Sequence, residues 1–158
     1  MPSEFGSFAA ELFDIPDLAQ LVRVVVRLAT AAFLGGVLGI QREKVGKDAG
    51  LRTHMLVALG AALFTVGAVE AGMAVADLSR VFQGIAAGIG FIGAGAILKL
   101  TSEQEIKGLT TAATLWLTAA VGTAVGAGQL WIPVVGVLLA FVILVALGRF
   151  ARGEGNVD

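Results

Sequence analysis

The sequence GLTTAATLWLTAAVGTAVGAGQLWIPVVGVLLAFVILVALG, from Gly108 to Gly148, has 41 residues and contains no Asp, Glu, Lys or Arg. An α-helix of about 20 apolar residues crosses the hydrocarbon core of a bilayer, because that core is about 30 Å thick and each residue adds about 1.5 Å. The stretch is therefore long enough for two crossings and a turn between them. It predicts a protein whose solvent is lipid.

The composition of the whole chain leads to the same prediction. The 158 residues are 57% hydrophobic and 15% charged, and the mean hydropathy is +0.89, which lies outside the range of soluble domains. The net charge of −1 and the lack of a basic patch with interleaved aromatics exclude a nucleic-acid partner. The chain has no cysteine, which excludes disulfides and thiolate metal sites.

Charge-poor windows predict an all-α fold, a polytopic transmembrane helix bundle of about five spans. The transmembrane domain is expected over residues 21–148, between an outer interfacial segment, residues 1–20, and a short cytoplasmic tail, residues 149–158. The acidic first 20 residues do not resemble a cleaved signal peptide, and either a short interfacial helix or an extended tail fits them. The predicted spans cover residues 21–40, 53–75, 81–98, 109–126 and 130–147.

The distribution of Lys and Arg predicts the orientation. Eight of these residues lie on the side that contains the loop after span one, the loop after span three and the C-terminus, against three on the other side. By the positive-inside rule, the N-terminus is outside and the C-terminus is cytoplasmic.

A shift of the sequence by 58 residues aligns Phe33–Gly36 with Phe91–Ala94, and Gly50–Thr53 with Gly108–Thr111. The alignment predicts that spans one and two form a parallel repeat with spans three and four, an arrangement known in transporters. Chance similarity is the alternative, since Gly, Ala and Leu are common in this chain.

Small residues four positions apart allow helices to approach closely in a bilayer. Three pairs of glycines within the predicted spans have this spacing. Span three carries five glycines, which predicts a central position for that span. The alternatives to ordinary bundle packing are a subunit interface and a bent backbone that lines a pathway. The residues expected at helix contacts are Gly35, Gly39, Gly84, Gly88, Gly90, Gly93, Gly95, Gly122 and Gly126.

Several charged residues fall in the predicted outer half of the membrane. A charge at this depth is expensive unless it is paired or hydrated, so we expect Arg27 to pair with Asp77 or Glu70. The alternative is that Arg27 extends to the lipid headgroups while Asp77 caps a helix. The expected ion-pair network consists of Arg27, Glu70, Asp77, Arg80 and Gln83.

A second polar group is predicted on the cytoplasmic side. In one interpretation, its charges set the orientation of the chain in the membrane and contact lipid headgroups. In the other, they form a site that faces the threonine stripe of span four, which consists of Thr111, Thr114 and Thr118. The predicted cluster consists of Arg42, Glu43, Lys47, Arg52, Thr53, His54, Thr110, Thr111 and Thr114.

Catalytic and metal motifs do not appear in the sequence. A single histidine excludes histidine-based metal sites, and no GxSxG, P-loop or CxxC motif occurs, so the chain is not expected to be an enzyme. Glu43 and Asp77 are the weak candidates for a metal ligand.

Five segments, in order along the chain, resemble the successive motifs of the MgtC/SapB family of bacterial membrane proteins. The family usually has Glu where this chain has Gln41, which removes one carboxylate from a cation site. The segments are LGIQRE at 38–43, AGLRTH at 49–54, Asp77–Arg80, GIGFIGAG at 88–95 and GLTTAATLW at 108–116.

The resemblance implies a multi-pass protein of the bacterial inner membrane that is linked to magnesium homeostasis. It is closest to short members without a C-terminal cytoplasmic domain. It implies a regulatory module that acts on other membrane proteins such as the F-type ATP synthase, with a transporter or channel for Mg²⁺, H⁺ or a small solute as the alternative. No resident cofactor is expected, with Mg²⁺ only as a ligand or transported ion, and small-residue spacing predicts a homodimer or other homo-oligomer. A third hypothesis gives the polar groups a purely structural role.

Overall fold

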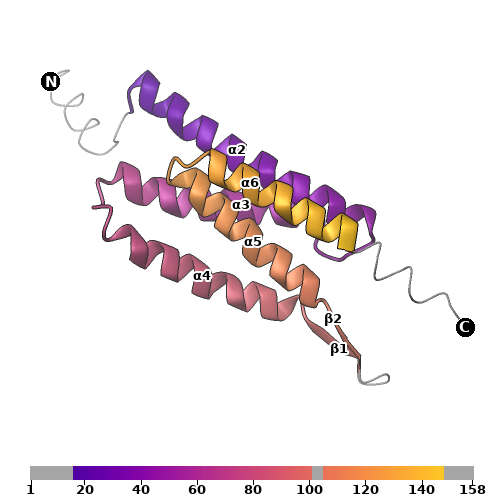
Figure 1. Ribbon diagram of the computed structural model, residues 1–158. Helices are drawn as coiled ribbons and strands as arrows, with labels where there is room; N and C mark the ends of the chain where they lie inside the picture. Colours follow the sequence, from indigo (N-terminus) through magenta and orange to yellow (C-terminus); the bar gives the residue numbers. More distant parts are fainter. Residues whose placement is uncertain (1–15, 101–104, 148–158) are drawn as a thin grey trace, which may run out of the picture.

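The computed structural model describes residues 16–100 and 105–147. Within them the fold is an all-α bundle whose helices run side by side, with a short hairpin at one end (Figure 1). The elements are α2 (Leu18–Lys44), α3 (Leu51–Glu70), α4 (Leu78–Gly95), β1 (Leu98–Leu100), β2 (Glu105–Lys107), α5 (Leu109–Gly126), α6 (Trp131–Val142) and the π-helix η1 (Ile143–Leu147).

Four of these helices, α2, α3, α4 and α5, are long and apolar enough to cross a membrane, and α6 with η1 forms a shorter apolar segment. The predicted all-α bundle is therefore confirmed. Residues 1–15 of the predicted interfacial segment and the predicted cytoplasmic tail lie outside the described residues, whereas residues 18–20 belong to α2.

Hydropathy located the spans but not all of their ends. The second helix ends at Glu70 instead of residue 75, because Gly72 adopts a left-handed φ of 75° and the backbone N–H of Met73 donates to the carbonyl of Ala68. This is a glycine-terminated helix end, which a hydropathy window does not detect. The first helix runs past residue 40 to Lys44, so Arg42 and Glu43 belong to its last turn and not to a loop.

The segment between α4 and α5 is an antiparallel hairpin that was not predicted. In its register Leu98 pairs with Lys107 and Leu100 with Glu105. Helix α4 accordingly ends at Gly95, before the expected end of span three at residue 98.

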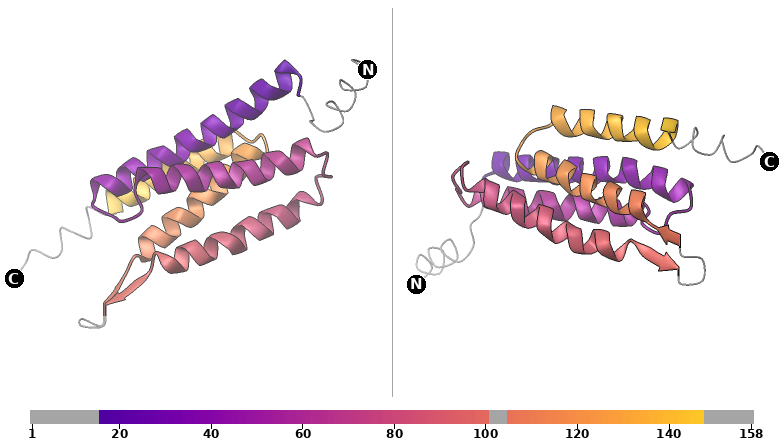
Figure 2. Two further views of the ribbon diagram at one scale, coloured as in Figure 1. Left: turned by 180° about the vertical axis from the view of Figure 1, so that it is seen from behind. Right: turned by 60° about the horizontal axis from the view of Figure 1, so that its bottom comes forward.

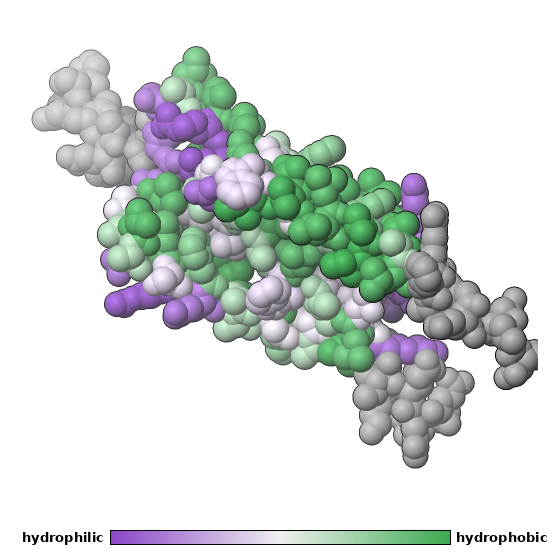
Figure 3. Space-filling model, viewed as in Figure 1, coloured by the Kyte–Doolittle hydropathy of each residue, from purple (hydrophilic) through white to green (hydrophobic). Residues whose placement is uncertain are grey.

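The side-chain distribution is reversed relative to a water-soluble protein. Buried positions are rich in small or polar residues such as Ala31, Ala58 and Thr118, whereas Phe33 and Phe91 are 67% and 86% exposed. On the face in Figure 3, hydrophobic residues cover the middle of the bundle and hydrophilic ones gather at its two ends. This is the pattern expected of helices surrounded by lipid.

Helices α2, α3 and α5 form the core. A Cβ atom at Gly35 would lie 2.6 Å from the carbonyl oxygen of His54, and a Cβ at Gly126 would lie 2.8 Å from that of Ala62. Gly122 approaches the backbone of Ala58 even more closely. The backbones are thus packed at distances that only glycine permits.

The prediction that the glycine-rich third span is central is wrong. Within α4 only Leu78, Ile89 and Gly93 are buried, and this helix lies at the periphery of the bundle in both views of Figure 2. A Cβ at Gly84 or Gly88 would meet no atom within 4 Å. The central helix is α5, which packs on α2, α3, α4 and α6.

Two contacts are related by the offset of 58 residues that predicts the repeat. Gly35 approaches His54 between α2 and α3, and Gly93 approaches Ala112 between α4 and α5. Helices α3 and α5 also begin 58 residues apart, each directly after a glycine. These correspondences favour the predicted parallel repeat.

Candidate functional site: a buried polar cluster at one end of the bundle

The strongest candidate site lies where the end of α2 meets the starts of α3 and α5. Arg42, in the last turn of α2, is 4% exposed, although it carries a guanidinium group. Its Nη2 donates a hydrogen bond of 3.0 Å to Oγ1 of Thr111, and its Nε has no partner among the described residues. A buried cation with one neutral partner is costly and is therefore a candidate functional group.

His54 lies in the first turn of α3 and is fully buried. Its Nδ1 is 2.9 Å from the carbonyl oxygen of Gly50. Because a carbonyl oxygen only accepts, the proton is assigned to Nδ1, which leaves Nε2 as an acceptor in the neutral ring. Nε2 has no hydrogen-bond partner within the described part of the chain.

Gln41 adds a third buried polar side chain. It is 8% exposed, and its Oε1 has no partner among the residues that the structure describes. The sequence did not single it out as a site residue, and the only signal was its place in a motif where the family has Glu. Unpartnered buried polar atoms are rare in folded proteins, and here three of them gather on adjoining helices.

Glu43 has a structural role in this region. Its Oε2 accepts a hydrogen bond of 2.8 Å from the backbone N–H of Leu51, the first residue of α3. A Cβ at Gly50 would lie 2.7 Å from the same oxygen. Glu43 therefore supplies the N-terminal cap that Gly50, which has no side chain, cannot supply.

The threonines of α5 mostly bond to their own helix. Thr114 donates to the carbonyl of Thr110 at 2.6 Å, and Thr118 donates to that of Thr114 at 2.7 Å. Such bonds to residue i−4 satisfy the hydroxyl groups inside the helix. Thr111 differs, because its Oγ1 accepts from Arg42.

The remaining members of the predicted cytoplasmic cluster lie outside this buried group. Lys47, Arg52 and Thr110 are exposed, and Thr53 is half-buried. The structure thus narrows the site to Gln41, Arg42, His54 and Thr111, which we call the Arg42 cluster.

At the opposite end of the bundle, the expected ion pair of Arg27 is not formed. Arg27 donates from Nη1 to the carbonyl oxygen of Gly126 at 3.3 Å instead of pairing with Asp77 or Glu70. A Cβ at Gly128, whose φ is 85°, would lie 3.0 Å from Nη2. The free carbonyls and the negative dipole end of α5 take the place of the expected carboxylate.

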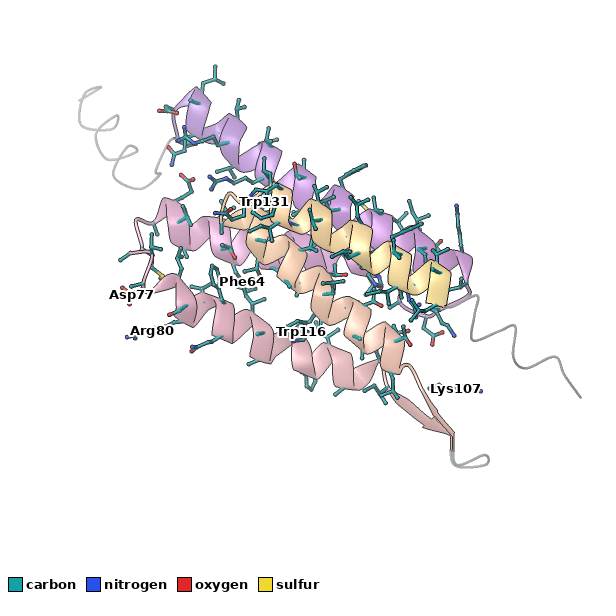
Figure 4. All side chains as sticks on the ribbon, viewed as in Figure 1. Phe64, Asp77, Arg80, Lys107, Trp116 and Trp131 are labelled. Atoms are coloured by element: carbon teal, nitrogen blue, oxygen red, sulfur yellow. The ribbon has the colours of Figure 1, made fainter. Side chains whose placement is uncertain are left out.

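The other members of the expected network are also separate. Glu70 accepts a 2.7 Å hydrogen bond from Gln20, a partner that the sequence did not suggest, and Gln83 is exposed. Asp77 and Arg80 lie 3.9 Å apart, with 55% and 84% of their side chains exposed (Figure 4). Asp77 occupies the cap position of α4, but its side chain makes no capping hydrogen bond. A pair this exposed contributes little stability.

The two weak metal candidates lie on different elements and have different roles. Glu43 caps α3, and Asp77 faces solvent at the other end of the bundle (Figure 4). No group of three or more His, Cys, Asp or Glu side chains within residues 16–100 and 105–147 is arranged to hold a metal ion.

The fold and the site define a polytopic α-helical membrane protein with a buried basic cluster. Comparison with known proteins places it more narrowly, because residues 28–152 match the MgtC family. The chain belongs to the MgtC family. The family resemblance of the five motifs is thereby confirmed.

Three relatives show how much of the chain is shared. It is 43% identical to protein SrpB of Synechococcus elongatus over 80% of this chain and 74% of the relative. It is 39% identical to the putative magnesium transporter YhiD of Escherichia coli over 76% of this chain and 58% of the relative. It is 46% identical to protein MgtC of Brucella abortus over 68% of this chain and 44% of the relative. The chain thus spans about half of the length of the last two. No solved structure matches it.

Proposed function

We propose that this protein acts in bacterial magnesium homeostasis as a regulatory module that binds another membrane protein and does not itself carry Mg²⁺. The partner that the family resemblance suggests is the F-type ATP synthase. The main observation in support of the proposal is the Arg42 cluster, which places a buried cation at the end of a closely packed core.

The packing of the core favours regulation over conduction. Gly35, Gly122 and Gly126 bring the backbones of α2, α3 and α5 so close that a single added methyl group would collide with the facing helix. A route for a hydrated ion along this core would require these helices to separate. Close packing of this kind fits a structural or interaction module better than a pore.

The positive charge of the Arg42 cluster also favours regulation over conduction. A divalent cation is bound by several oxygen ligands, of which carboxylates are the strongest. Arg42 places a positive charge in the core instead, and the carboxylate beside it, Glu43, is engaged by the N-terminus of α3. The cluster would therefore repel Mg²⁺.

The test begins with ion flux. The purified protein is reconstituted in liposomes that contain either a Mg²⁺-sensitive or a pH-sensitive dye, and we expect no flux above that of empty liposomes. A clear Mg²⁺ or proton flux that disappears in Asp77→Ala or Glu43→Gln would overturn the proposal. Glu43→Gln is a suitable variant because glutamine keeps an oxygen that can cap α3.

The regulatory part is tested separately in membrane vesicles. We expect ATP synthase subunits to co-purify with the wild-type protein, and ATP-driven proton pumping to fall when the protein is present. Arg42→Met should lose both effects, and Lys47→Met, an exposed cation beyond the same helix end, should keep them. Co-purification that is equal for the two variants would show that the Arg42 cluster does not contribute to partner binding.

Transport of Mg²⁺ is the second candidate function. It is favoured by the name of the Escherichia coli relative, which describes that protein as a putative magnesium transporter. The flux measurement above separates the two candidates.

A further inference from the structure

An apolar groove separates α3 from α4. Its volume is about 780 Å³, and Ala119 of α5 contributes to its wall. Most of its lining is aliphatic or aromatic, and Phe64 of α3 lies between the two helices (Figure 4). The polar residues in its lining are Arg52 and Thr53, which belong to the first turn of α3.

Glycines make the groove hollow. Gly60 of α3 and Gly84 and Gly88 of α4 all line it, and a Cβ at any of them would meet nothing within 4 Å. Elsewhere in this bundle, the glycines of α2 and α5 fit against a facing helix. The glycines of the groove leave a slot that no described part of the chain fills.

The groove has one cationic end. Arg52 and Thr53 at the start of α3 lie at the same end of the bundle as Ile92 near the end of α4, because the two helices are antiparallel neighbours joined by a short turn. The opposite end is formed by Phe64 and Val81. Arg52 is exposed and forms no ion pair with another described residue.

The length of the groove matches one leaflet of a bilayer. From Arg52 to Phe64, the lining of α3 extends about 18 Å at about 1.5 Å per residue. Half of a bilayer's hydrocarbon core is about 15 Å thick. A chain that lies along the slot with its polar end at Arg52 would therefore span one leaflet.

We propose that this groove is a binding site for one anionic phospholipid. One of the two acyl chains of the lipid lies along Gly60, Gly84 and Gly88, and the phosphate group is bound by Arg52. The apolar lining favours the acyl chain, and Arg52 in the lining complements the charge of the headgroup. The proposal is independent of the regulatory function, since it depends on a different face of the molecule.

The first test replaces glycines that line the groove by a larger residue. Native mass spectrometry of the protein released from detergent should show one retained phospholipid for the wild type. Gly84→Leu and Gly88→Leu should lose it, because the added side chain occupies the slot. Gly90→Leu is the matched control, since Gly90 also lies on α4 with open space around it but does not line the groove.

The second test concerns the headgroup. In mixtures of phosphatidylglycerol and phosphatidylethanolamine, we expect the wild type to prefer phosphatidylglycerol about fivefold, because one basic residue near the membrane surface provides attraction of that order. Arg52→Gln should abolish the preference, whereas Lys47→Gln, an exposed cation outside the groove, should retain it.

Three results would overturn the proposal. One is a wild-type protein that retains no phospholipid, and another is equal retention in Gly88→Leu and Gly90→Leu. The third is a dimer that dissociates in Gly84→Leu and Gly88→Leu while lipid retention is unchanged, which would show that a second copy of the chain occupies the groove.

Discussion

Arg42 shows how a single residue can be buried at a cost to stability. Its guanidinium has Thr111 as its hydrogen-bond partner, and its Nε is unsatisfied among the described residues. Replacing a buried charge by an apolar side chain of similar length is often neutral or stabilising, whereas removing its partner is destabilising. The two kinds of substitution therefore have opposite expected effects.

We expect Thr111→Val to lower the free energy of unfolding by about 1 to 3 kcal/mol, because a buried donor loses its acceptor. Thermal unfolding in detergent would measure the change. The double variant Arg42→Met/Thr111→Val should regain most of the loss, since no unpaired charge is left. A Thr111→Val protein as stable as the wild type would show that the hydrogen bond contributes nothing.

Arg27 gives a second prediction at this scale. Its contact with the carbonyl of Gly126 places a cation at the C-terminus of α5, an interaction that contributes about 0.3 to 2 kcal/mol. Arg27→Gln should therefore lower the unfolding temperature in detergent. Arg23→Gln, on an exposed position one turn earlier, should not change it. Equal effects of the two variants would contradict the assignment.

At the scale of the helix, the same residue type has two different roles. Gly122 of α5 approaches the backbone of Ala58, while Gly90 of α4 has no atom within 4 Å of a Cβ. Small-residue spacing predicted that both helices pack closely, but it could not reveal which face meets another helix. That depends on the position of each helix in the bundle.

The matched pair Gly122→Ala and Gly90→Ala tests this difference. We expect Gly122→Ala to destabilise the protein by about 1 to 3 kcal/mol or more through overpacking. Gly90→Ala should stabilise it by up to about 1 kcal/mol, because alanine reduces the backbone freedom of the unfolded chain and meets no obstacle. Unfolding of both variants in mixed micelles provides the measurement. Similar shifts for both would disprove the assigned packing.

At the scale of the whole molecule, the two ends of the bundle carry different charges. The positive-inside rule predicts that the loop between α2 and α3 is cytoplasmic and that the turn between α3 and α4 is outside. The structure places these segments at opposite ends (Figure 1). The orientation itself stays a prediction.

Single-cysteine labelling tests the orientation without background, since the chain has no cysteine. We expect a membrane-impermeant maleimide to label Met73→Cys in intact cells and to label Lys47→Cys only after the cells are opened. Both positions are exposed and lie outside the helices. The reverse pattern would invert the topology.

Hydropathy by itself determined that the chain is a bundle of apolar helices, because a bilayer requires about 20 apolar residues per crossing. The motifs also determined the family, and the start and end of α5 were predicted from the sequence at Leu109 and Gly126. These features are local in the sequence, so they can be read from a short window.

Only the tertiary structure decided which polar groups meet. Arg27 contacts the end of a helix that lies 99 residues away in the sequence, and Arg42 reaches Thr111 across 69 residues. The positions of α5 at the centre and of α4 at the edge likewise depend on packing between helices. In lipid the outward and inward faces are both apolar, so hydrophobic periodicity loses the signal that would distinguish them, and close backbone packing decides instead.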